Sequence, residues 1–118
     1  MRYKYSFPRI RKDRIHFQLP DHVGHFTDFI SEISEIEIAD RILKYVDDVL
    51  SGREDEIECM SNAPTVIIRP KISKAYNDFS SHPDEIQEME TEEFRKLLVV
   101  WKEKLVEERE EKRRKEDS

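Results

Sequence analysis

Two histidines three residues apart, His22 and His25, come closest in type and spacing to a metal site. Imidazole nitrogens and a thiolate are ordinary zinc ligands, so Cys59 or His82, with Asp21 beside the pair, would complete a tetrahedral set. The spacing is generic, and no second close pair of such ligands follows in the chain. We therefore predict two loop histidines, no metal site and no cofactor.

Paired carboxylates are the second candidate for chemistry, because adjacent acids stand at 47–48 and 54–56. General acid–base catalysis requires an apolar or like-charged pocket that raises the pKa of one carboxyl group. These acids fall on predicted exposed faces around a turn. The chain has two glycines, too few for a glycine-rich phosphate loop, and it contains no nucleophile elbow. The sequence therefore predicts a binding protein and not an enzyme; a small hydrolase that uses these acids or the histidine pair is a rival class.

Length and composition limit the class of protein further. The chain has 118 residues, which is one domain, and 41% of them are charged. No apolar run approaches the roughly 18–20 residues that cross a bilayer. The N-terminus lacks the apolar segment of a secretory signal, and one cysteine cannot form an internal disulfide. We expect a cytoplasmic protein that makes no contact with membranes.

Charge is distributed unevenly along the chain, whose formal net charge is -6. Residues 21–60 hold twelve acids and three bases, whereas residues 1–20 hold six bases and one acid. An acidic block attracts cationic partners and repels phosphate backbones. The N-terminal bases alternate with aromatic residues, a pattern typical of strands that bind nucleic acid or of charged edge strands that resist pairing. The net negative charge of the chain disfavours binding to nucleic acid. A nucleic-acid-binding or adaptor module that uses the basic N-terminal strands is therefore the alternative function and not the first one.

Apolar periodicity predicts the elements of the N-terminal half. Alternating residues indicate short strands at 3–7, ended by Pro8, and at 14–19. Apolar residues at helical spacing over 27–35 favour a helix capped by Thr27. A firmer apolar stripe predicts a helix over 36–50, and Gly52 then supplies the left-handed conformation that ends it.

Strands and one helix are predicted in the C-terminal half. Runs of strand-forming residues occur at 54–60, 65–69, 72–79 and 86–90. Thr91 then begins the strongest helix, with an apolar stripe formed by Phe94, Leu97, Leu98, Trp101 and Leu105.

These elements predict an α+β fold. One antiparallel sheet of four or five strands packs against one or two helices, including a long C-terminal helix, in a single domain over residues 1–106. Residues 107–118 contain no apolar residue. Opposite charges four residues apart there predict a charged helical extension or a frayed tail.

The order of segments in the C-terminal half resembles a known family. A helix closing with VDDVLSG is followed by EDEIECMSN, by TVIIRPKISKAYNDF and by EMETEEFRKLLVVWKEKL. This order is similar to that of small immunity proteins of bacterial polymorphic-toxin and contact-dependent growth inhibition systems. The resemblance covers residues 46–105, about half of the chain, and leaves the N-terminal third unmatched. It implies one-to-one binding of a cognate toxin domain, often a basic nuclease, whose active site is blocked.

The acidic block suggests where such a toxin would bind. Opposite charge accelerates encounter, while a few desolvated side chains supply most of the affinity. The predicted contact surface consists of Asp47, Asp48, Glu54, Asp55, Glu56, Glu58, Tyr76 and Asp78. Self-association through the C-terminal helix or an open sheet edge is left open.

Overall fold

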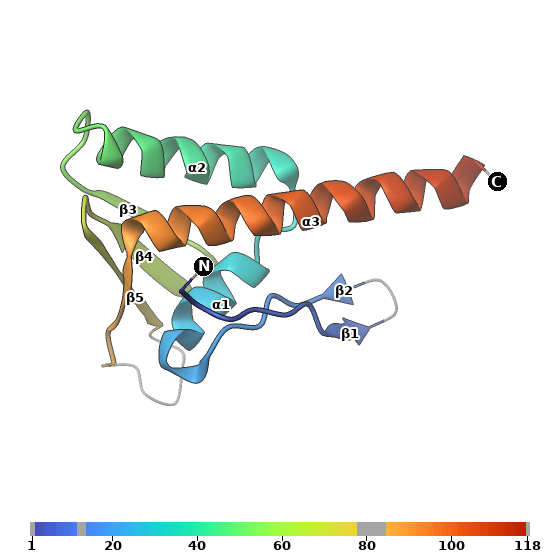
Figure 1. The fold of residues 1–118 in the computed structure, drawn as a ribbon, viewed down its shortest axis with the longest axis horizontal. Helices are drawn as coiled ribbons and strands as arrows, with labels where there is room; N and C mark the ends of the chain where they lie inside the picture. Colours follow the sequence, from blue (N-terminus) through green and yellow to red (C-terminus); the bar gives the residue numbers. More distant parts are fainter. Residues whose placement is uncertain (1, 12–13, 78–84, 118) are drawn as a thin grey trace.

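The computed structural model describes residues 2–11, 14–77 and 85–117 and confirms the predicted α+β fold (Figure 1). Its main sheet has four antiparallel strands in the order β3-β4-β5-β6. The strands are β3 (Ile57–Met60), β4 (Pro64–Ile68), β5 (Ile72–Asn77) and β6 (Gln87–Glu90). A second sheet has two short strands, β1 (Arg9–Arg11) and β2 (Arg14–Ile15).

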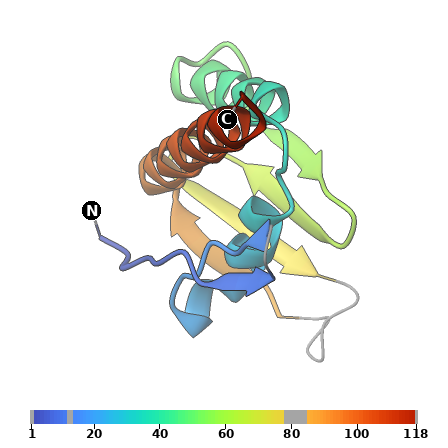
Figure 2. The same ribbon diagram turned by 90° about the vertical axis from the view of Figure 1, so that its right-hand side faces the viewer.

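Three α-helices complete the fold: α1 (Gly24–Ser31), α2 (Ile36–Leu50) and α3 (Thr91–Asp117), with a 3-10 turn at Asp21–Val23 before α1. They lie on one face of the main sheet, with α2 and α3 side by side (Figure 2). The helix predicted over 36–50 has the observed bounds of α2, and Gly52 has the expected positive φ of 84°. In the part of the chain that the structure describes, no helix is both long and apolar enough to cross a membrane.

Alternation along the strands divides the side chains between a covered and an uncovered face of the sheet. Val66, Ile68, Ala75 and Met89 point to the covered face and are buried. The register pairs Val66 with Ala75, so apolar residues of neighbouring strands lie together under the helices. This face forms the base of the hydrophobic core.

Trp101 links α3 to the N-terminal segment. The residue is 2% exposed, and its ring stacks on Phe17 with centroids 5.6 Å apart and on Phe7 at 6.2 Å. Its indole N–H donates a hydrogen bond of 2.7 Å to the carbonyl oxygen of Ile33. The prediction of a buried apolar stripe on the C-terminal helix is confirmed at Trp101.

The first predicted N-terminal strand is misplaced, and the second is shorter than predicted, because β2 covers only the first two of residues 14–19. Residues 3–7 pair with the neighbouring segment only through the bridge between Ser6 and Gln18, and β1 follows Pro8 instead of ending before it. Proline has no amide hydrogen, so the ladder restarts beyond it, where the Pro8 carbonyl accepts from the amide of His16 at 2.9 Å. Aromatic packing holds the earlier segment: Tyr3 is buried, and the ring of Phe7 stacks on that of Phe17.

Two other boundaries differ from the predictions. Helix α1 begins at Gly24, so Thr27 is a buried residue within the helix and not its cap. Strand β3 begins at Ile57 and not at residue 54, because the amides of Arg53 and Glu54 donate to the carbonyl of Asp48 and close the end of α2. Beyond β5, residues 78–84 lie outside the described part of the chain.

Candidate functional site

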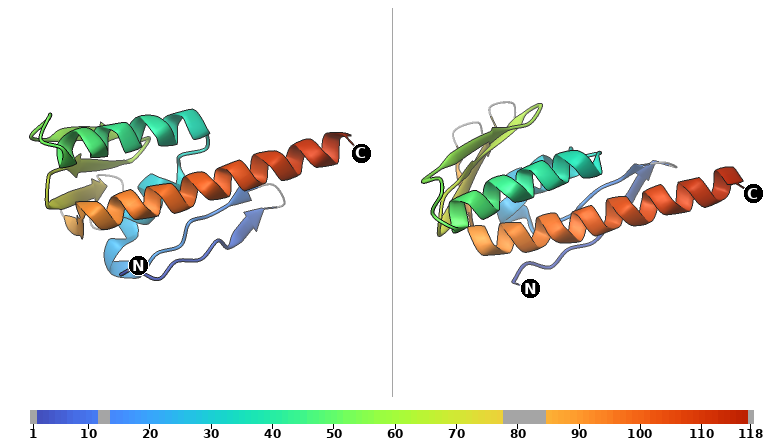
Figure 3. Two further views of the ribbon diagram at one scale, coloured as in Figure 1. Left: turned by 45° about the horizontal axis from the view of Figure 1, so that its top comes forward. Right: turned by 90° about the horizontal axis from the view of Figure 1, so that it is seen from above.

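The uncovered face of the main sheet is the candidate binding surface, and we call it the open face. Figure 3 shows the three helices on one side of the sheet and none on the other. The open face consists of Glu56, Glu58, Met60, Thr65, Ile67, Arg69, Ile72, Lys74, Tyr76, Ile86 and Glu88. These side chains alternate with those that enter the core.

One row across the open face, which we call the apolar row, has exposed apolar side chains at both ends, while Thr65 within it is buried and Tyr76 is half-buried. The register pairs Met60 with Thr65 and Thr65 with Tyr76. Extending the pairing of β5 with β6 by one residue sets Ile86 level with Tyr76. Met60 is 75% exposed and Ile86 59%, so large apolar side chains stand at both ends of this row. Exposed apolar side chains gathered on one face mark interaction surfaces more often than scattered ones do.

The next row is charged and mixed in sign. It runs from Glu58 through Ile67 and Lys74 to Glu88. The hydroxyl of Tyr76 donates to Oε1 of Glu58 at 3.3 Å, and Lys74 Nζ lies 3.9 Å from Glu88. The face therefore offers carboxylates beside the apolar row without being uniformly acidic.

Three of the predicted contact residues meet on the open face. Glu58 and Tyr76 share a hydrogen bond, and Glu56 forms an ion pair of 2.6 Å with Arg69. Glu54 and Asp55 lie on the exposed turn between α2 and β3, close in sequence to this edge of the sheet. Neither carboxylate forms an ion pair with the residues that the structure describes.

Asp47 and Asp48 lie at the C-terminal end of α2 and are already paired. Asp47 accepts from Nε of Arg95 at 2.7 Å, an interaction that raises the pKa of the arginine. Asp48 is 3.4 Å from Arg53 and 3.6 Å from Lys44. Asp78, the remaining predicted contact residue, lies outside the described residues.

A ladder of ion pairs joins α2 to α3 and neutralises part of the acidic block. Three cations spaced seven residues apart on α3 reach three acids of α2: Arg95 to Asp47, Lys102 to Asp40 at 2.5 Å and Arg109 to Glu37 at 3.3 Å. The two helices are antiparallel, so along the series of ion pairs the residue numbers rise on α3 and fall on α2. The acidic surface is consequently smaller than the local charge of residues 21–60 predicts.

Exposed apolar residues are what the sequence analysis missed. Met60, Ile72 and Ile86 are 75%, 36% and 59% exposed, and none was a predicted contact residue. The alternation that placed Ile57 and Cys59 toward the core also places Met60 on the opposite face beside Glu58. The exposure of Met60 could therefore have been predicted from the alternation of residues 57–60.

The prediction of two loop histidines is wrong, because His22 belongs to the 3-10 turn and His25 to the first turn of α1. His22 is exposed, whereas His25 is buried and its amide donates to Oε1 of Gln87 at 2.6 Å. Burial raises the pKa of the Cys59 thiol, which disfavours the reactive thiolate. His82 lies outside the described residues. Among the residues that the structure describes, no cluster of three or more His, Cys, Asp or Glu side chains could hold a metal ion.

Comparisons of the chain with protein-family models, with curated proteins and with solved structures give no match. Membership of an immunity-protein family therefore stays a prediction from the sequence pattern. Function has to be inferred from the geometry of the open face and its neighbouring turn.

Proposed function

We propose that this protein is an immunity protein that binds a cognate toxin domain one to one and blocks its activity. The observation that best supports this is the apolar row of the open face, which ends in the exposed side chains of Met60 and Ile86 and lies beside Glu58, a carboxylate that forms no ion pair with the described residues. The protein acts in the cytoplasm by occupying its partner and carries out no reaction itself.

The apolar row would supply most of the affinity. Tyr76 is half-buried between its neighbours, with Met60 and Ile86 exposed at the ends of the row. Aromatic anchors near the centre of an interface carry a large share of binding energy, and flexible methionine adapts to an irregular partner surface. The expected contact is therefore a sheet face packed against the toxin, with Tyr76 near its centre.

The carboxylates would supply selectivity for a basic partner. Glu54, Asp55 and Glu58 are exposed, and no described cation forms an ion pair with them. A nuclease that binds a phosphate backbone carries a positive cleft, which these acids complement. Salt screens exposed charges, so the association should weaken as ionic strength rises.

The partner is best sought beside the gene. If the gene immediately upstream encodes a long secreted protein, its C-terminal domain is expressed and titrated with this chain by calorimetry at low and high salt. One-to-one binding that weakens with salt supports the proposal. The absence of binding to that domain overturns it.

Variants test whether the open face makes the contact. Tyr76→Ala should weaken binding about thirtyfold or more, the loss of a typical anchor of about 2 kcal/mol. Glu58→Lys should also weaken binding and should reduce its dependence on salt. Glu103→Lys, the same charge change on an exposed position of α3, is the matched control. Full affinity in both open-face variants would exclude this face as the contact surface.

A further inference from the structure

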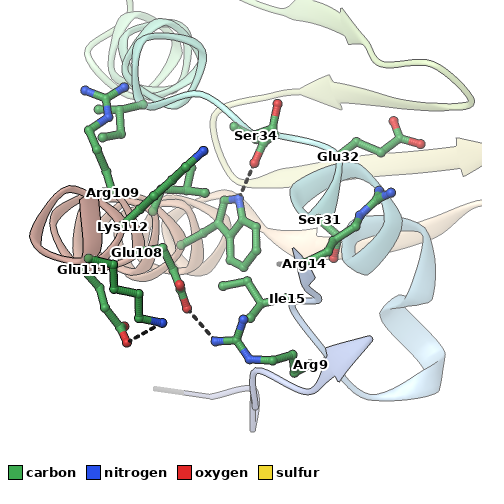
Figure 4. Close-up of a pocket in the computed structure, with 15 residues that line it drawn as sticks. Arg9, Arg14, Ile15, Ser31, Glu32, Ser34, Glu108, Arg109, Glu111 and Lys112 are labelled. Carbon is green, nitrogen blue, oxygen red and sulfur yellow. Dashed lines mark hydrogen bonds and ion pairs between the residues drawn. The ribbon is translucent and has the colours of Figure 1, made fainter. Parts of the chain in front are cut away.

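A second surface, distinct from the open face, is a groove between the β1–β2 hairpin, the connection from α1 to α2 and the outer half of α3 (Figure 4). Its volume is about 1130 Å³. None of the residues that line it belongs to the open face. We call it the basic groove.

Apolar side chains from all three segments form the floor of the basic groove. Ile15 comes from β2, Ile33 from the connection, and Trp101 and Leu105 from α3. The indole of Trp101 is held in place by its hydrogen bond to the Ile33 carbonyl and by its stacking on Phe17. The floor is therefore fixed in shape before any ligand binds.

The charges lining the groove are opposite in balance to those of the whole protein. Five cations and three acids line it, although the chain has a net charge of -6. Figure 4 shows Arg9 and Arg14 on the hairpin side and Arg109 and Lys112 on the α3 side. Arg9 is paired with Glu108 at 3.0 Å, whereas Arg14 and Lys112 form no ion pair with the residues that the structure describes.

We infer that the basic groove binds an acidic amphipathic peptide segment of another protein. The apolar side chains of the segment would cover Ile15, Ile36 and Leu105, which line the groove and are partly exposed, while its carboxylates would meet Arg14 and Lys112. The volume exceeds the roughly 300–1,000 Å³ of small-molecule sites, which suits a peptide. This inference does not rest on the proposed function, because the two surfaces share no residue.

A single-stranded nucleic acid fits the groove less well than a peptide does. Such ligands stack their bases on exposed aromatic rings. Trp101 is the aromatic residue in the described lining, and it is 2% exposed, so its ring face is not available for stacking. Charge alone would attract phosphates, which makes nucleic acid the competing outcome of the test.

The 118-residue chain carries its own probe of the groove, because Trp101 is its single tryptophan. The ligand is a helical peptide composed of leucine and glutamate, and the control peptide has lysine in place of every glutamate. Binding is followed by tryptophan fluorescence and by the indole N–H signal in a proton–nitrogen correlation spectrum. The glutamate peptide should bind saturably and shift that signal, and the lysine peptide should not.

Paired charge reversals locate the binding. The double variant Arg14→Glu, Lys112→Glu should weaken binding of the glutamate peptide at least tenfold. In the matched control the same two reversals are made at Arg113 and Arg114, exposed α3 residues that do not line the groove, and affinity should stay within about twofold. Unchanged circular dichroism and melting temperature establish that both variants fold.

Two results would overturn the inference. One is the absence of saturable binding by the glutamate peptide, or binding that the double variant leaves intact. The other is tighter binding of a single-stranded RNA oligonucleotide that the same double variant abolishes, which would assign the groove to nucleic acid. Loss of toxin binding in the open-face variants would affect neither result.

Discussion

Met89 and Met60 belong to the same four-stranded sheet but to opposite faces of it. Met89 is 1% exposed beneath the helices, whereas Met60 is 75% exposed on the open face. Both strands obey the same alternation, and the difference arises because the helices pack on one side only. The covered face therefore contributes to stability, and the open face is free to contact another molecule.

The side chains beneath and between the helices should dominate the free energy of unfolding. Trp101→Ala is expected to lower it by about 3–5 kcal/mol, because a buried ring stacked on two others leaves a cavity when removed. Urea denaturation measures the change. Trp101→Phe, which keeps an aromatic ring but loses the hydrogen bond to Ile33, should cost less. A loss under about 1 kcal/mol on truncation to alanine would contradict the buried position of Trp101.

The two methionines give a direct comparison of the faces. Met89→Ala should destabilise the protein by about 2–5 kcal/mol, and Met60→Ala by less than about 0.5 kcal/mol, because only the first change empties space in the core. Denaturant unfolding of the two variants under one set of conditions measures both values. Equal losses would mean that the open face is covered in the isolated protein.

Loss of a buried hydroxyl at the start of α3, on the covered side of the sheet, should lower the stability less than the changes at Trp101 and Met89. Thr91 is fully buried, and its hydroxyl hydrogen-bonds with the Arg69 carbonyl and, at 2.7 Å, with the Ser73 hydroxyl. Thr91→Val keeps the shape but leaves those groups without their partner, so a loss of about 1–3 kcal/mol is expected. Thermal unfolding measures the loss. Thr91→Ser retains the hydroxyl and should be the milder variant; the reverse order would exclude the hydrogen bonds as the cause.

Stability should also depend on pH through Asp28 on α1. Partial desolvation raises the pKa of its carboxyl group above the usual 3.8 even though the residue is exposed at the surface, and the nearby His16 and His25 lower that pKa in part. The folded state thus holds this proton more tightly than the unfolded state does. The stability that protonated Asp28 contributes is complete below about pH 4 and is lost as the pH rises through the raised pKa.

Removal of that carboxyl group should produce a smaller change than the losses expected at Trp101, Met89 and Thr91. Asp28→Asn is expected to melt at a higher temperature than the parent at pH 7, with little difference at pH 3. Asp55→Asn, on the exposed turn beside the open face, is the control and should show no such gain. Melting curves at the two pH values measure both effects, and a gain at pH 3 alone would reverse the expected sign.

Local patterns accounted for much of the fold. The apolar stripe and Gly52 predicted α2 from Ile36 to Leu50, and β-branched residues predicted the central strand β4. The predicted strand positions were wrong where tertiary packing, and not the local sequence pattern, decides the conformation of the backbone. Residues 3–7 alternate like a strand, but aromatic contacts hold them and the ladder begins beyond Pro8. Such contacts join residues far apart in the sequence, so periodicity does not reveal them.

The candidate site was predicted in part for a similar reason. Glu58 and Tyr76 were predicted to lie on one surface and do share a hydrogen bond. The residues between them and around them were not recognised, although the alternation of β3 exposes Met60. The contact surface was predicted mainly from the local excess of acids, and this criterion does not detect the apolar residues that an interface needs at its centre.

The sequence by itself determined the elements: α2 and α3, the strand alternation and the separation of acidic from basic segments, because these follow from local periodicity and composition. Only the tertiary structure decided how those charges combine. The antiparallel packing of α2 and α3 sets Arg95 beside Asp47 and Arg109 beside Glu37, which neutralises part of the acidic surface. The tertiary fold also places the hairpin beside α3, where Arg9 pairs with Glu108 and a basic groove forms in an acidic protein. Electrostatic effects depend on distance in space, and the chain order does not specify that distance.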